Sequence, residues 1–117
     1  MNQLPTFPTS GKHITHCRAA LALLLEGRRV DQFVYHLRTG LPLVDFRTRI
    51  SNLTLKNGWP IEREFHLTRD FNGEPRRVMN YWLDSDLMAA CFAADPAFKA
   101  RCEMFRQQWG ESLCQAG

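Results

Sequence analysis

Two predicted helices come first along the patterned part of the chain, and the first is apolar enough to be covered on more than one face. Residues 15–27 are rich in Ala and Leu and carry leucines at positions i, i+3 and i+4. This spacing predicts a core-facing helix that Thr15 caps and Gly27 ends. Asp31 is a favourable N-cap for a second helix that runs to Gly40. The buried positions predicted for this second helix are Phe33, Val34 and Leu37.

A third helix follows Leu41-Pro42, where the proline disfavours helical backbone for the residue before it. We expect this helix to cover residues 43–56 and to stop at Asn57-Gly58. On a helical wheel one side of this helix is apolar, and we expect it to face the core; it carries Leu43, Phe46, Ile50 and Leu53. The opposite side is mainly polar, although Val44 and Leu55 also point outward.

After Trp59-Pro60 the apolar residues recur at every second position instead of at helical spacing. Residues 61–69 alternate, which predicts a strand, and the Asn-Gly turn within residues 70–75 leads to a return strand over residues 76–83. The short link at residues 28–30 offers one further edge strand. The face predicted for the first strand carries Ile61, Phe65 and Leu67.

The two ends of the chain differ in character. Residues 1–12 contain two prolines and a glycine, which predicts a flexible leader from which Leu4 or Phe7 packs on the body. Residues 84–117 predict two more helices, the second starting at Asp95-Pro96. This last helix bears a regular apolar stripe of Phe98, Cys102, Phe105 and Trp109.

Composition and charge fit one ordinary globular domain. The 117 residues carry a formal net charge of +3, and the basic excess lies between residues 28 and 77, with ten Arg or Lys against six Asp or Glu. We find no signal peptide and no stretch long enough to span a membrane, so we expect a cytoplasmic protein. Its thiols should then be reduced; the cysteines are Cys17, Cys91, Cys102 and Cys114.

Residues 17–83 resemble a family of winged helix-turn-helix domains common in bacteriophage and prophage proteins. The resemblance lies in the helix ending LLEG, the runs TRISNL and NGWPI, the turn FNGEPRRV and the aromatic end MNYWL. It implies an α+β, mainly helical fold in which three helices and a β-hairpin wing span residues 13–83. Residues 84–117 would be a helical extension that packs on this domain or mediates dimerisation.

The resemblance implies binding of double-stranded DNA, with the third helix in the major groove and the wing on the backbone. Arg and Asn side chains suit base edges, and flanking basic residues suit phosphates. On this helix the candidates are Arg47, Thr48, Arg49, Ser51, Asn52 and Lys56. On the wing they are Arg69, Asn72, Arg76 and Arg77. We therefore predict a transcription regulator of phage or prophage type.

Other functions fit the sequence to different degrees. A protein-interaction module is favoured by the outward Val44 and Leu55 and by Glu62 and Glu64 on the wing. An excisionase-like protein that bends DNA would make the same contacts with DNA as a regulator. The apolar stripe of the last helix is expected either to pack on the domain or to form a homodimer interface. The sequence has no pairs of metal ligands at short spacing and no catalytic signature, so we expect no bound metal, no cofactor and no enzyme activity.

Overall fold

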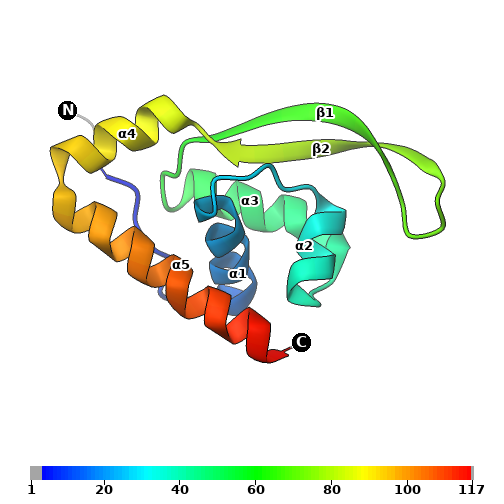
Figure 1. Ribbon diagram of the computed structural model, residues 1–117, viewed down its shortest axis with the longest axis horizontal. Helices are drawn as coiled ribbons and strands as arrows, with labels where there is room; N and C mark the ends of the chain where they lie inside the picture. Colours follow the sequence, from blue (N-terminus) through cyan, green and yellow to red (C-terminus); the bar gives the residue numbers. More distant parts are fainter. Residues whose placement is uncertain (1–3, 117) are drawn as a thin grey trace.

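The computed structural model describes the backbone of residues 4–116 and the side chains of residues 4–109. Three helices, an antiparallel hairpin and two C-terminal helices follow one another in a winged-helix layout, which confirms the predicted α+β fold class (Figure 1). The elements are α1 (Ile14–Leu25), α2 (Gln32–Thr39), the 3₁₀ turn η1 (Leu43–Asp45), α3 (Phe46–Leu55), β1 (Ile61–Arg69), β2 (Pro75–Leu83), α4 (Ser85–Ala94) and α5 (Pro96–Ala116).

Helix ends match their predicted signals in α2 and depart from them in α1 and α3. One carboxylate oxygen of Asp31 accepts hydrogen bonds from the first-turn amides of α2, and Gly40 ends that helix with a positive φ of 74°. Thr15 does not cap α1, because the helix already begins at Ile14. Likewise α3 starts at Phe46 rather than at residue 43, since the three residues after the proline form a 3₁₀ turn.

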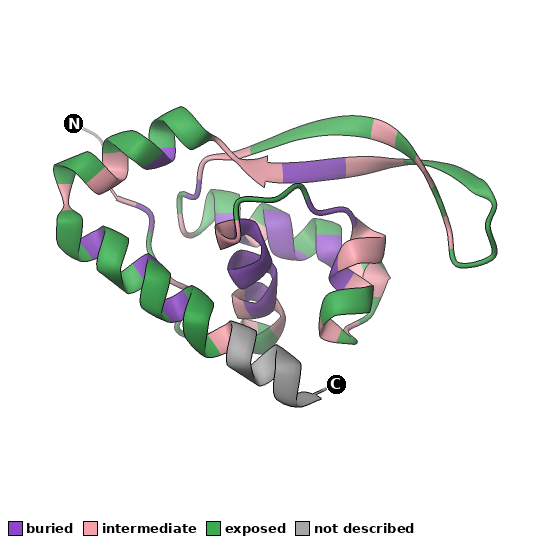
Figure 2. Cartoon of the chain, in the orientation of Figure 1, coloured by how far each residue is buried: buried purple, intermediate pink, exposed green. Residues whose placement is uncertain are grey.

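One hydrophobic core unites both ends of the chain. Buried positions concentrate on α1, on the inner side of α3 and on the side of α5 that faces α1 (Figure 2). The wheel predicted for α3 is correct at Phe46, Ile50 and Leu53, which are all buried. In α2 the prediction is wrong at Leu37, which is 71% exposed, whereas Phe33 and Val34 are partly buried and Val34 packs against the core. The buried residue of α2 is Tyr35, whose ring stacks on Phe46 at 4.7 Å.

Residues 4–8 of the leader, for which the sequence predicted a flexible segment, are docked on the body of the protein. The Thr6 amide donates to the Asn57 carbonyl at 2.9 Å, and the Thr6 carbonyl accepts from the Trp59 indole at 2.7 Å. Phe7 packs between Trp59 and Phe105, with ring centroids 5.5 and 5.1 Å away. The expected contact of Phe7 with the body is therefore confirmed, and it forms part of the core.

The apolar stripe of α5 packs into this same core. Phe98, Cys102 and Phe105 are buried against the rest of their own chain, and Trp109 is partly buried beside Phe105. Burial raises the pKa of the Cys102 thiol to about 11. The alternative of a homodimer interface is thus wrong for the three buried residues, because they are not accessible to a second copy.

The hairpin is a two-stranded sheet in which Ile61 pairs with Leu83 and Arg69 with Pro75. At the place where the sequence offered an edge strand, Val30 forms only an isolated antiparallel bridge with Tyr81 of β2. The outer half of the hairpin extends beyond the helices, which leaves Phe65 and Leu67 exposed (Figure 1). None of the described helices is long and apolar enough to cross a membrane.

We expect Phe7→Ala to lower the free energy of unfolding by roughly 2–3 kcal/mol, less than for a fully buried phenylalanine because this ring is only partly buried. Urea denaturation followed by tryptophan fluorescence would measure the change. Met104→Ala is the matched control, since Met104 is exposed on α5 and its loss should change stability little. Equal stability of Phe7→Ala and wild type would contradict the docked leader.

Candidate nucleic-acid interface

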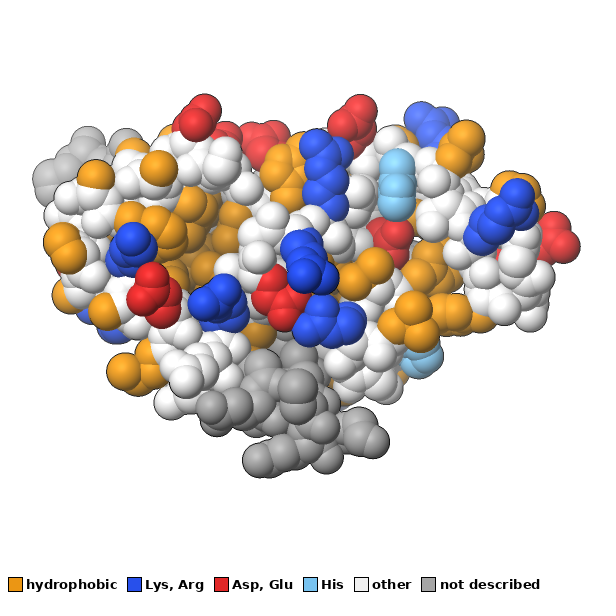
Figure 3. All heavy atoms as spheres, viewed as in Figure 1, with side chains coloured by type: hydrophobic (Ala, Val, Ile, Leu, Met, Phe, Trp, Pro, Cys, Tyr) orange, Lys and Arg blue, Asp and Glu red, His pale blue; other side chains and the backbone are white. Residues whose placement is uncertain are grey.

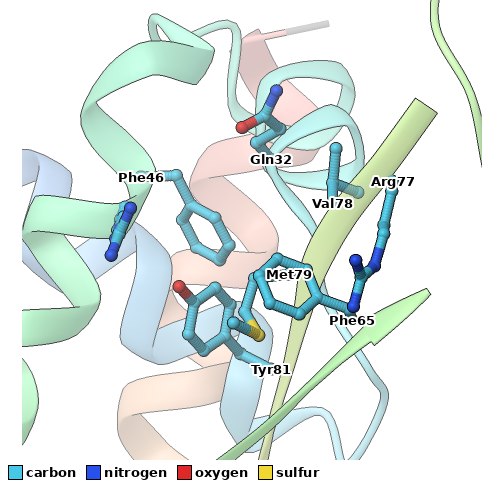
Figure 4. Close-up of a pocket in the computed structure, with 8 residues that line it drawn as sticks. Gln32, Phe46, Phe65, Arg77, Val78, Met79 and Tyr81 are labelled. Carbon is cyan, nitrogen blue, oxygen red and sulfur yellow. The ribbon is translucent and has the colours of Figure 1, made fainter. Parts of the chain in front are cut away.

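A groove runs between α3 and the hairpin and consists of two adjoining pockets that share Arg47 and Tyr81. The first, of about 210 Å³, lies over the middle of β2, where Phe46 and Tyr81 point toward each other and Phe65 and Arg77 stand on the outer side (Figure 4). The second, of about 420 Å³, is lined mainly by exposed residues of α3 and by the start of β1. We call these two pockets together the arginine groove.

Three arginines give the arginine groove its charge. Arg47 comes from α3, Arg63 from β1 and Arg77 from β2, and none of the described residues lining either pocket is acidic. Burial raises the pKa of Tyr81, while the charges of Arg47 and Arg63 act in the opposite direction. Both guanidinium groups therefore lie close enough to the Tyr81 hydroxyl to act on it.

The outer edge of the groove combines charge with an aromatic surface. The Arg77 guanidinium lies 4.5 Å from the centroid of the Phe65 ring, in cation–π geometry. Phe65 is about half exposed, so its ring and the arginine above it both face solvent. Such a pair presents a planar cation to a phosphate or to a base.

The α3 candidates divide between two sides of the helix. Arg47, Thr48 and Ser51 are exposed, and Arg47 and Ser51 line the arginine groove. Arg49 is only 6% exposed, so its predicted place on the base-reading face is wrong. Asn52 is partly buried and its amide approaches Cys17 of α1 at 3.9 Å, and Lys56, although exposed, lies on that same side.

The wing candidates near the turn are held by the turn itself. Asp70 accepts hydrogen bonds from the amides of Asn72 and Glu74 at 2.9 and 3.0 Å and from Nε of Arg76 at 3.0 Å. Arg69 donates to the carbonyl of Gly73 at 2.7 Å. These contacts order the exposed tip, and they lower the pKa of Asp70, chiefly through the hydrogen bond from Arg76.

Two contacts fix the hairpin to α2. His66 of β1 donates through Nε2 to the buried Asp31 carboxylate at 2.9 Å, and Phe71 in the turn packs edge-on against Phe33 at 5.4 Å. Phe71 also lies 5.5 Å from the ring of His36. Apolar side chains accordingly gather at the wing end of the face seen in Figure 3. These contacts hold the wing in a defined position against α2.

Sequence reasoning missed Arg63, Tyr81 and Phe71. The alternation of β1 contained the signal for Arg63, since residues 61, 63 and 65 must share one face of a strand. Tyr81 follows from the register, because it pairs with Arg63. The contact of Phe71 with α2 depends on how the hairpin bends, which neither alternation nor turn type specifies.

Among the described residues, no group of three or more His, Cys, Asp or Glu side chains is placed to hold a metal ion. Comparisons with protein-family models, with curated proteins and with solved structures find no match to this chain.

We expect Asp70→Ala to speed hydrogen exchange at the amides of Asn72 and Glu74, because it removes the acceptor of both. In the wild type this protection should be complete above the ordinary carboxyl pKa of 3.8 and should be lost as the pH falls through the lowered pKa of Asp70. Glu74→Ala is the matched control, since it removes an exposed carboxylate from the same turn. Identical exchange rates in both variants would contradict the role of Asp70.

Proposed function

We propose that this protein binds double-stranded DNA, with the exposed side of α3 in the major groove and the hairpin along the adjacent backbone. The observation that carries the proposal is the arginine groove, in which three arginines from three elements face solvent beside the exposed polar side of α3. Positive charge at that place suits the phosphates on either side of a groove entered by a helix.

The side chains have different roles in this proposal. Thr48 and Ser51 are exposed on α3 and are short enough for hydrogen bonds to base edges from a helix lying in the groove. Arg47, Arg63 and Arg77 neutralise phosphates and set the register of the helix. The motif resemblance supports a transcription regulator of phage or prophage type, and an architectural protein that bends DNA would use the same contacts.

Fluorescence anisotropy with a mixed-sequence duplex at two salt concentrations tests the proposal. We expect a dissociation constant of about 1–100 μM at low salt, weakening steeply as salt rises. Arg47→Ala and Arg77→Ala should each weaken binding about three- to tenfold for all sequences and reduce the salt slope by about one. Arg106→Ala is the control, because this exposed arginine lies on α5, away from the groove.

The absence of saturable binding at low salt would overturn the proposal. Equal losses for Arg47→Ala and Arg106→Ala would contradict the assignment of the groove even if the protein binds DNA, because binding would then follow net charge alone. A specific site, once found, would extend the test to Thr48→Ala and Ser51→Ala, which should reduce discrimination between bases and leave binding to random DNA unchanged.

A second candidate function is the recognition of another protein through α3. Val44 and Leu55, near the two ends of this helix, are 78% and 83% exposed, which a helix devoted to DNA does not require. If α3 recognises a protein, Leu55→Ser should abolish the activity of this protein in cells, while Arg47→Ala should leave that activity intact. DNA binding predicts the reverse, so an assay in cells with these two variants separates the candidates.

A further inference from the structure

A second basic pocket lies on the other side of α3, against the leader and the start of α1. It has a volume of about 300 Å³, and two of the three lysines of the chain, Lys12 and Lys56, line it. Arg49 also lines this pocket, and none of the described lining residues is acidic. We call it the leader pocket; it is lined by residues 8–14, Cys17, Arg49, Asn52, Lys56 and Asn57.

The N-terminus of α1 opens into the leader pocket. The helix has 12 residues, its N-cap residue His13 makes no side-chain capping bond, and its first turn contains no acidic residue. Lys12, His13 and Ile14 line the pocket at this end of the helix. By helix geometry the amides of Thr15 and His16 point toward this end and have no carbonyl partner within the helix. Free amides and the positive end of the helix dipole make such a terminus attractive to anions.

Arg49 supplies an independent sign of a missing ligand. Its side chain is more than nine-tenths buried, and the buried Nε and Nη1 atoms have no hydrogen-bond partner among the described residues. Asp45, one turn earlier, faces His16 instead, with 3.8 Å between its carboxylate and Nδ1. A buried guanidinium without a counter-charge is costly, which favours an anion bound from outside.

The surroundings of Arg49 reinforce this conclusion. The hydroxyl of Tyr35 is also buried and has no hydrogen-bond partner within the described part of the chain. Burial raises the pKa of Tyr35, and the charge of Arg49 lowers it in part, so the guanidinium lies near a neutral phenol. The charge of Asp45 also acts on Tyr35, but among the described residues no carboxylate forms an ion pair with Arg49.

We propose that the leader pocket binds a phosphate group, held by the first-turn amides of α1, by Arg49 and by the ammonium groups of Lys12 and Lys56. A phosphate has several strong acceptor oxygens pointing in different directions, which suits donors that converge from a helix end and from two side-chain types. Binding pockets for drug-sized molecules start near 300 Å³, so this pocket has room for a group of that size.

The phosphate could belong to the DNA backbone or to a small phosphate compound, and the chemistry of recognition is shared. The leader pocket and the arginine groove lie on different sides of α3, with Ser51 lining only the groove and Asn52 only the pocket. A duplex lying along α3 could therefore place one strand over each. The phosphate site itself does not depend on the proposed DNA binding.

Titration of the full-length protein with inorganic phosphate at constant ionic strength tests the site, with backbone amide shifts as the readout. We expect saturable shifts at Thr15 and His16. Lys12→Gln combined with Lys56→Gln should weaken binding about tenfold, in keeping with the contribution of charge-assisted hydrogen bonds. Both lysines are exposed, so this variant should fold normally.

Lys99→Gln is the matched control for charge, since Lys99 is exposed on α5, and its phosphate affinity should equal that of the wild type. Arg49→Met should abolish the shifts at Thr15 and His16 if it folds, which the rest of its amide spectrum reports. Absence of saturable shifts in the wild type, or the same affinity in the double lysine variant, would overturn the proposal.

Duplex binding then identifies the source of the phosphate. If DNA supplies it, inorganic phosphate competes with the duplex and the double lysine variant binds the duplex more weakly. If a small compound supplies it, phosphate and duplex bind together and the lysine changes leave duplex affinity unchanged. A protein that binds phosphate and no duplex would refute the proposed DNA binding and keep the phosphate site.

Discussion

Trp59 is the residue on which the arrangement of the helices and the hairpin depends. Its amide donates to the Leu53 carbonyl at the end of α3, and its carbonyl accepts from Ile61 at the start of β1. The buried ring donates to the leader through Nε1 and packs beside Phe98 of α5, 5.8 Å between centroids. Through its backbone and its side chain, this one residue joins the end of α3, the start of the wing, the leader and the C-terminal helix. The distance between α3 and the hairpin follows from this junction.

A consequence is that the sides of α3 have different surroundings. Phe46, Ile50 and Leu53 enter the core, while the docked leader and α1 cover the side that carries Arg49. Arg47 and Ser51 remain beside the hairpin, where the arginine groove forms. The same short helix therefore contributes positive charge to two separate pockets. This division explains why an arginine that a helical wheel places outside is buried.

Local signals predicted most of the fold, and long-range packing determined what they missed. The cap at Asp31, the glycine at position 40 and the alternation of β1 are properties of a few neighbouring residues, so they could be interpreted directly. The burial of Arg49 depends on a leader more than thirty residues away in sequence, and no helical period encodes that contact. Tyr35 was missed for a related reason, since its burial requires the stacked ring of Phe46.

The wing adds a constraint of its own, centred on the buried carboxylate of Asp31. One of its oxygens caps α2 and the other accepts from His66, so the start of a helix and the middle of a strand share one charged group. Phe71 repeats the attachment near the tip. A hairpin fixed at two points loses little conformational freedom when it meets a partner, which lowers the entropic cost of binding. The arginines of the groove are consequently held at a set spacing before any ligand arrives, and that spacing, more than the modest net charge, is what a rigid partner such as a duplex would recognise.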